Sequence, residues 1–176
     1  FTPRPVIDSR ARHRTMIPDE EYQNGHILTS QSLKKLTDAG VSINLGAHGQ
    51  LQGLGAHWEL WMLQQGGMTN QEALACATIN GARYLGMDQE IGSLKVGKLA
   101  DLIVIDGNPL ANIQDSEKVE MTMVNGRLYD SATMNEIGNY DVPRSKFYFE
   151  LPGSGNAWPL MTETGTFMPT QCACQR

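Results

Sequence analysis

Histidine is the side chain best suited to acid–base or metal chemistry near neutral pH, and this chain has four. His48 directly follows a predicted strand and stands between Gly46 and Gly49, which let the backbone turn sharply. A neutral imidazole at a strand end can bind Zn²⁺ or act as a general base. The alternative is a turn histidine that hydrogen-bonds to nearby backbone. His48 is the first candidate for a catalytic or metal-binding residue.

His57 and Glu59 follow His48 at the start of the next predicted helix. A loop of this length can bring both histidines to one cavity, but their spacing is not the H-E-x-x-H pattern of a helical zinc site. His57 is otherwise a capping or partly buried residue packed on Trp61. Glu59 could orient an imidazole or face solvent. Both are candidates for a supporting role behind His48.

The cysteines give a weaker signal. Three are too few for a disulfide framework. Cys76 lies in an apolar helical context, which predicts a core position. Cys172 and Cys174 could hold a soft metal through two thiolates, but a tetrahedral site needs further ligands and none is close in sequence. The alternative is two incidental thiols in a frayed tail, and their role is left open.

Composition places the chain among globular proteins. Its 176 residues suit one ordinary domain, and 40% apolar residues argue against disorder. A net charge of −5 gives no footprint for nucleic acid, and no apolar run approaches the roughly 20 residues of a membrane helix. The N-terminus carries no signal-peptide pattern and does not begin with Met, so we expect a processing or truncation point there. Cytoplasm and periplasm both remain open.

The elements that must position His48 come in the first half of the chain. A helical pattern at 27–36 places Ile27, Leu28, Leu33 and Leu36 on one stripe, and Gly40 supplies its stop. Residues 41–45 alternate as a short strand that ends at the His48 loop, which makes the second half of a βαβ unit. Further helices are predicted at 56–65, at 73–77 behind a capping box at 69–72, and at 81–85.

The second half changes character. Strands are predicted at 99–106, 119–124 and 127–129, with the hairpin turn Asn125-Gly126 between the last two. The pattern divides the chain into residues 1–90, 91–137 and an irregular tail at 138–176. About three strands are few for independent stability, and one βα end is not a closed barrel. This organisation predicts a piece that needs partners.

Two motifs carry a resemblance to a known family. The stretch G-M-T-N-Q-E-A-L-A-C-A-T-I-N-G-A-R-Y-L-G at 67–86 resembles the amidohydrolase pattern G-T-x-x-E-A-L-x-A-A-T-x-N-x-A-R-x-L-G. The stretch I-G-S-L-K-V-G-K-L-A-D-L-I-V-I-D at 91–106 is similar to the I-G-S-L-x-x-G-K-x-A-D-L-V-V-L-D that follows it. N-P-L at 108–110 and V-N-G-R at 124–127 come in the expected order. The chain most resembles imidazolonepropionase-like amidohydrolases, in the subgroup whose domain can follow a TolB-like β-propeller.

This resemblance implies an α/β fold: the C-terminal part of a (β/α)₈ barrel at 1–90 and part of a small composite β-sandwich at 91–137. Members of the family activate water on one or two divalent metals, usually zinc, and hydrolyse amide or related C–N bonds. Their ligands are a His-x-His pair on the first strand, a mid-barrel Lys or Glu, two later histidines and an Asp that ends the last strand. Only this last position falls in the chain, and it aligns with His48.

The family pattern has Asp at that position, so His48 departs from it. A neutral imidazole is a weaker charge partner for a metal than a carboxylate. The upstream ligands are absent, so we expect the chain alone to lack most of its metal site. One hypothesis is a portion of a metal-dependent amidohydrolase, inactive alone, whose complete form acts on a small amide, peptide or cyclic amide. The alternative is a non-catalytic binding or oligomerisation module. Either way, exposed strand edges predict a homo-oligomer, with no nucleic-acid or membrane partner.

Overall fold

The computed structural model describes residues 25–48, 53–147 and 150. His13, Cys172 and Cys174, with the rest of 1–24 and 151–176, lie outside the described residues. The chain forms two units, residues 14–143 and residues 1–13 with 144–176. In the second unit, the Arg144 guanidinium makes two 2.6 Å hydrogen bonds to the Glu150 carboxylate.

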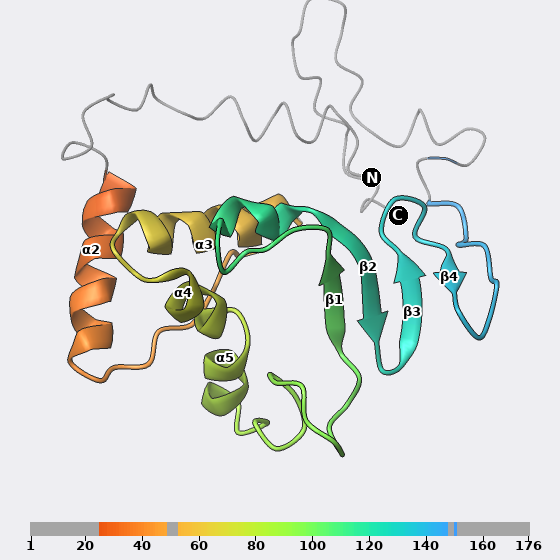
Figure 1. The fold of residues 1–176 in the computed structure, drawn as a ribbon, viewed down its shortest axis with the longest axis horizontal. Helices are drawn as coiled ribbons and strands as arrows, with labels where there is room; N and C mark the ends of the chain where they lie inside the picture. The colour runs from red at the N-terminus through yellow and green to blue at the C-terminus, as the bar shows by residue number, and fades with distance from the viewer. Residues whose placement is uncertain (1–24, 49–52, 148–149, 151–176) are drawn as a thin grey trace, which may run out of the picture. The chain divides into compact units, whose positions relative to one another are not determined.

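The first unit contains four α-helices, one 3₁₀ helix and four strands in its described part (Figure 1). In chain order they are α2 (Gly25–Asp38), α3 (Leu54–Gln65), α4 (Asn70–Cys76), α5 (Ile79–Tyr84), β1 (Leu102–Ile105), η2 (Ile113–Glu117), β2 (Val119–Val124), β3 (Arg127–Asp130) and β4 (Glu136–Ile137). Helices come first and the sheet follows, with η2 inserted between β1 and β2. This is the mixed α/β content that the sequence predicts.

Helix α2 ends where the sequence places its stop. Gly40 has φ +86°, its N–H donates to Thr37 O at 2.9 Å, and the N–H of Val41 donates to Leu36 O at 3.0 Å. This pair of bonds satisfies the last helical carbonyls and needs the left-handed backbone that glycine adopts freely. The predicted stripe of α2 is only partly buried, because Leu28 and Leu36 are exposed.

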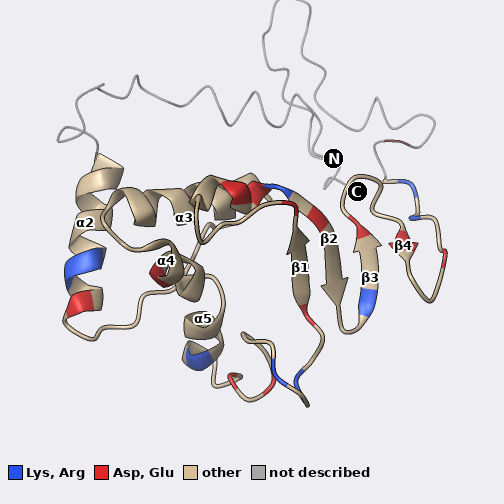
Figure 2. Cartoon of the chain, viewed as in Figure 1, with Lys and Arg blue, Asp and Glu red and all other residues tan. Residues whose placement is uncertain are grey.

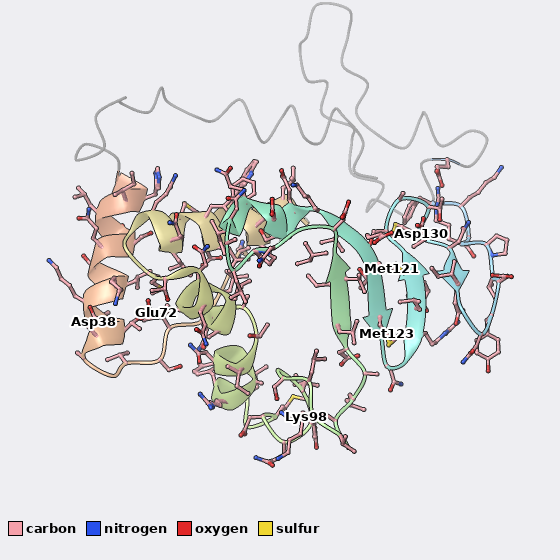
Figure 3. The ribbon with its side chains drawn as sticks, viewed as in Figure 1. Asp38, Glu72, Lys98, Met121, Met123 and Asp130 are labelled. Atoms are coloured by element: carbon pink, nitrogen blue, oxygen red, sulfur yellow. The ribbon has the colours of Figure 1, made fainter. Side chains whose placement is uncertain are left out.

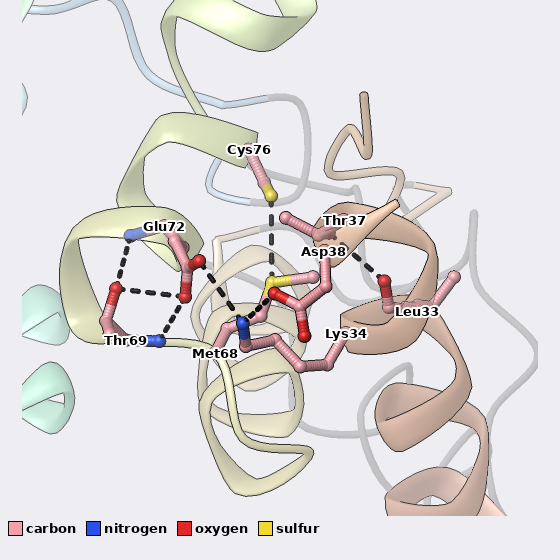
Figure 4. Close-up of polar contacts among 8 residues, drawn as sticks. All are labelled: Leu33, Lys34, Thr37, Asp38, Met68, Thr69, Glu72 and Cys76. Atoms are coloured by element: carbon pink, nitrogen blue, oxygen red, sulfur yellow. Dashed lines mark hydrogen bonds and ion pairs between the residues drawn. The ribbon is translucent and has the colours of Figure 1, made fainter. Parts of the chain in front are cut away.

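Helix α4 starts at the predicted capping box. The Thr69 hydroxyl accepts the N–H of Glu72 at 3.2 Å, and the Glu72 carboxylate accepts the N–H of Thr69 at 2.7 Å. Glu72 also lies 3.4 Å from Lys34 of α2, which pairs with Asp38 on its own helix (Figure 4). The same carboxylate therefore caps α4 and connects it to α2.

The hydrophobic core lies among the helices. Its buried members are Leu60, Leu63, Met68, Ala73, Cys76 and Ile113. Cys76 is thus a core residue, as predicted, and burial raises the pKa of its thiol. Helices α2 and α3 approach closely at Gly66, where an added Cβ would lie 2.7 Å from Ser30 O and closer still to Ser30 Cβ. Only glycine fits this contact.

The prediction of a strand at 41–45 is wrong for the described structure. Residues 41–47 belong to no helix or strand. A segment with alternating apolar residues becomes a strand only when a neighbouring strand pairs with its N–H and C=O groups, and the described residues provide no such neighbour. Ile43 and Leu45 nevertheless pack against the core, as the alternation predicts.

The sheet is antiparallel in the order β1-β2-β3-β4. Asn125 and Gly126, with φ +49° and +79°, form the predicted turn between β2 and β3. Strand β4 was not predicted, because its two residues are too short to show a period. In this register Leu102, Met123, Leu128 and Ile137 face one side, together with Val104 and Met121. Figure 3 labels the two methionines, Met121 and Met123, on β2.

Charged residues of both signs occur along the described helices, strands and loops (Figure 2). Strand β1 carries none, and α3 carries a single acidic residue, Glu59. A search of the described helices finds none that is long and apolar enough to cross a membrane.

Candidate functional site

His48 follows the irregular segment at 41–47 that leads from α2 toward α3. It is exposed and has φ +57°, a left-handed conformation that few non-glycine residues adopt. The segment before it packs on the helical core through Ile43 and Leu45. The position therefore combines an accessible imidazole with an anchored backbone. This combination suits either a metal ligand or a general base.

Glu59 contacts the His48 loop through the backbone. Both of its carboxylate oxygens accept the N–H of Gly46, at 3.0 and 3.1 Å. The sequence suggested that Glu59 orients an imidazole or faces solvent, and the structure shows a third arrangement. The carboxylate holds the chain two residues before His48. Within the described ranges, no hydrogen bond or ion pair joins Glu59 to the His48 ring.

His57 lies in the first turn of α3 and contacts η2. Its Nδ1 is 3.1 Å from the hydroxyl of Ser116, which also accepts the indole N–H of Trp61 at 3.1 Å. Burial lowers the pKa of His57, while the Glu117 carboxylate nearby acts in the opposite direction. Because the Ser116 oxygen accepts from Trp61, its own hydrogen is available to donate to a neutral His57. His57 thus joins α3 to the segment before β2.

Sequence reasoning missed Asn80. Its side-chain amide donates to Ile43 O at 3.1 Å, so helix α5 contacts the segment that leads to His48. The residue lies inside the A-T-x-N-x-A-R part of the first motif. A polar side chain inside an otherwise apolar helical stretch was the available signal, but its partner lies 37 residues away in sequence.

The residues of the second motif hold structure together. The Lys98 ammonium donates to Ile91 O at 3.0 Å, to Ser93 Oγ at 2.7 Å and to Asp88 O, and so closes the loop before β1. Asp101 accepts the N–H of Asn125 at 2.6 Å and fixes the hairpin turn. These two side chains explain the K-x-A-D pattern without any role in chemistry.

Arg127 of the V-N-G-R motif also has a structural partner. Its guanidinium makes two hydrogen bonds to Glu136, one of 2.8 Å to Oε1 and one of 2.5 Å to Oε2. Glu136 is only 4% exposed, and Arg127 lowers the pKa of its carboxyl. The ion pair joins β3 to the short strand β4.

The described residues do not make a complete metal site. No three His, Cys, Asp or Glu side chains within residues 25–48, 53–147 and 150 are grouped so that they could hold an ion. A catalytic zinc needs about three protein ligands, and His48 offers one. The donor set of the described residues therefore does not fit the metal that the resemblance implies.

Comparison with known proteins gives a consistent result. The chain is 46% identical over 63 residues to the 5′-deoxyadenosine deaminase of Methanobrevibacter smithii, a match covering 36% of this chain and 14% of that protein. It is 56% identical over 39 residues to the imidazolonepropionase of Symbiobacterium thermophilum, covering 22% and 9%. These matches span less than a fifth of each relative's length.

A crystal structure of a Xaa-Pro dipeptidase with methionine bound in its active site is also similar. The TM-score is 0.53 at 33% identity, and the match covers 58% of this chain and 25% of that one. The family model named Amidohydrolase family matches residues 27–129, more than half of the chain. On this match, which includes His48, α2–α5 and most of the sheet, the chain belongs to the amidohydrolase family.

Proposed function

We propose that this chain is the C-terminal portion of a metal-dependent hydrolase that cleaves C–N bonds with an activated water. Family membership carries the proposal. The matched deaminase, imidazolonepropionase and dipeptidase are named for different substrates, and hydrolysis at a C–N bond is the chemistry common to them. The substrate class is accordingly a small amide, peptide or cyclic amide.

Two surfaces of the fold lack a covering partner, and both support the proposal that this chain is part of a larger structure. Residues 41–47 have the apolar alternation of a strand but no strand partner in the described chain, as the last strand of a barrel would be without its neighbours. Every residue on the apolar side of the sheet is only partly buried. We propose that upstream residues complete a (β/α)₈ barrel around the first surface and a composite β-sandwich on the second.

The proposed contribution of this chain to the active site is His48, as metal ligand or general base. The ion is a divalent metal, usually zinc in this family. Its remaining ligands come from outside the described residues. His57 and Glu59 support the site indirectly, through Ser116 and through Gly46. No chemical step is assigned to the metal, because one imidazole does not define its coordination.

Metal content tests the role of His48. The purified chain, dialysed against Zn²⁺ and then against metal-free buffer, is analysed beside His48→Ala and a matched control, His26→Ala. Metal retained by the chain and the control but lost in His48→Ala supports a ligand role. Equal metal in all three proteins contradicts it. No metal in any of them supports a site whose affinity depends on the upstream ligands.

One observation favours a second candidate, a non-catalytic module that binds a second copy of itself. Val104, Met121, Met123 and Leu128 form an apolar sheet face that the described residues leave partly exposed. Both candidates predict an oligomer, so thermal unfolding of the chain alone distinguishes the two. A cooperative melt without any added segment supports the module, and a non-cooperative melt that becomes cooperative only with the missing portion counts against it.

A further inference from the structure

The backbone of the segment before His48 is held by helices instead of strands. Ile43 O accepts the side-chain amide of Asn80 at 3.1 Å. The N–H of Leu45 donates to Cys76 O, at the end of α4, at 3.0 Å. Buried backbone groups need such partners, because leaving them unpaired costs about as much as a lost hydrogen bond. Helices α4 and α5 therefore supply what a neighbouring strand normally supplies.

Helix α3 adds the third attachment, next to the histidine. The N–H of Gly46 points at the Glu59 carboxylate and lies 3.0 and 3.1 Å from its two oxygens. Glu59 is the only acidic residue of α3, and α3 has no basic residue. A hydrogen bond to an ionised carboxylate is roughly twice as strong as one between neutral groups. Glu59 thus makes a charge-assisted contact with the described part of this loop.

The chemistry of the two side chains is matched to the groups that they contact. Asn80 presents an N–H₂ donor to a carbonyl, and Glu59 presents an acceptor to an N–H. An aspartate at position 80 would place an acceptor against an acceptor. A glutamine at position 59 would still offer an amide oxygen, without the charge. These differences make each contact separately testable.

We propose that Glu59 and Asn80 are positioning residues that fix residues 43–46 and so set the backbone conformation of His48. The inference rests on the proposed role of His48 in the site, and it adds that this chain forms the loop by itself. A positive φ at a residue other than glycine persists only where the surroundings enforce it. The attachment at Gly46, two residues earlier, is the nearest such constraint.

Nuclear magnetic resonance of the whole chain tests the proposal without metal or substrate. Two signals are followed: the hydrogen exchange rate of the Gly46 amide, and the intraresidue NOE between the His48 amide and its Hα, which is strong only at positive φ. We expect Glu59→Ala to speed Gly46 exchange roughly tenfold or more, the fold-change that corresponds to loss of a charged hydrogen bond. The His48 NOE should weaken in the same variant.

Conservative variants separate positioning from general stability. Glu59→Gln should restore most of the Gly46 protection, because its amide oxygen still accepts. Asn80→Asp should weaken the His48 NOE, whereas Arg83→Ala, an exposed change on the same helix, should leave it unchanged. Gln64→Ala, an exposed change on α3, serves as the matched control for Glu59.

The proposal is overturned if a folded Glu59→Ala chain keeps the Gly46 exchange rate and the His48 NOE of the parent. It is also overturned if Gln64→Ala changes them as much. Failure here is distinct from failure of the proposed function. If the Glu59 and Asn80 variants leave the Gly46 and His48 signals unchanged, the metal analysis of His48→Ala can still succeed. If the chain binds no metal through His48, the Gly46 and His48 signals can still respond to the Glu59 and Asn80 variants.

Discussion

The helical region and the sheet of this chain bury their apolar residues very differently. Helices α2 to α5, with η2, enclose a core in which Leu63 and Met68 are each 2% exposed. In the sheet, the only buried residue among those described is Glu136, held by Arg127. A helix makes its backbone hydrogen bonds within itself and packs through one face. A small sheet needs another layer over its apolar face to be stable. The contrast predicts that stability is concentrated among the helices.

The largest effect should come from truncating the core. Leu63→Ala removes a buried side chain and leaves a cavity, so the free energy of unfolding should fall by about 2–5 kcal/mol. Met123→Ala, on the partly buried sheet face, should cost only roughly 1 kcal/mol. Urea unfolding monitored by circular dichroism measures both. Equal losses would show that the sheet is covered in solution, and the comparison would fail.

The next effect concerns the contact between α2 and α3. Gly66→Ala forces a Cβ into the Ser30 backbone, and we expect a loss of about 1–3 kcal/mol from overpacking. Gly81→Ala is the matched control, because nothing lies within 4 Å of its added Cβ. That change should stabilise α5 by roughly 0.5–1 kcal/mol, since alanine favours helix over glycine. Thermal unfolding of the two variants should move in opposite directions.

A smaller effect is expected in the sheet. Asp101→Ala removes the acceptor for the Asn125 N–H, and one such hydrogen bond contributes about 1 kcal/mol. Asp101→Asn retains an acceptor oxygen and should recover part of the loss. Hydrogen exchange at the Asn125 amide localises the change to the β2–β3 turn. An unchanged rate in Asp101→Ala would mean that strand pairing alone holds the turn.

The smallest expected effect is the pH dependence of the contact between α3 and η2. Burial lowers the pKa of His57 below its ordinary value of 6.5, so the unfolded chain binds this proton more readily than the folded one. This contribution to stability is present above pH 6.5 and is lost progressively as the pH falls below it. His57→Gln should flatten that dependence in urea titrations between pH 7.5 and 5.5, whereas His26→Gln should not. A parallel slope in His57→Gln would assign the dependence to other groups.

Much of the local structure follows from sequence alone. Gly40 ends α2, Thr69 and Glu72 cap α4, and Asn125-Gly126 turns the hairpin, because each needs only groups within a few residues. The two motifs at 67–86 and 91–106 indicated the family, and the periods of the apolar residues located the helices. His48 was singled out by its place after an alternating segment and between two glycines.

Other features depend on residues that are distant in sequence, and only the tertiary structure decided them. Residues 41–45 have the pattern of a strand, yet no strand lies beside them in the described chain, because pairing is a property of the neighbour. Glu59 could have faced an imidazole or solvent, and packing of α3 placed it on Gly46. His57 meets Ser116 across 59 positions. Local preferences set the elements, and long-range contacts determined what each polar side chain touches.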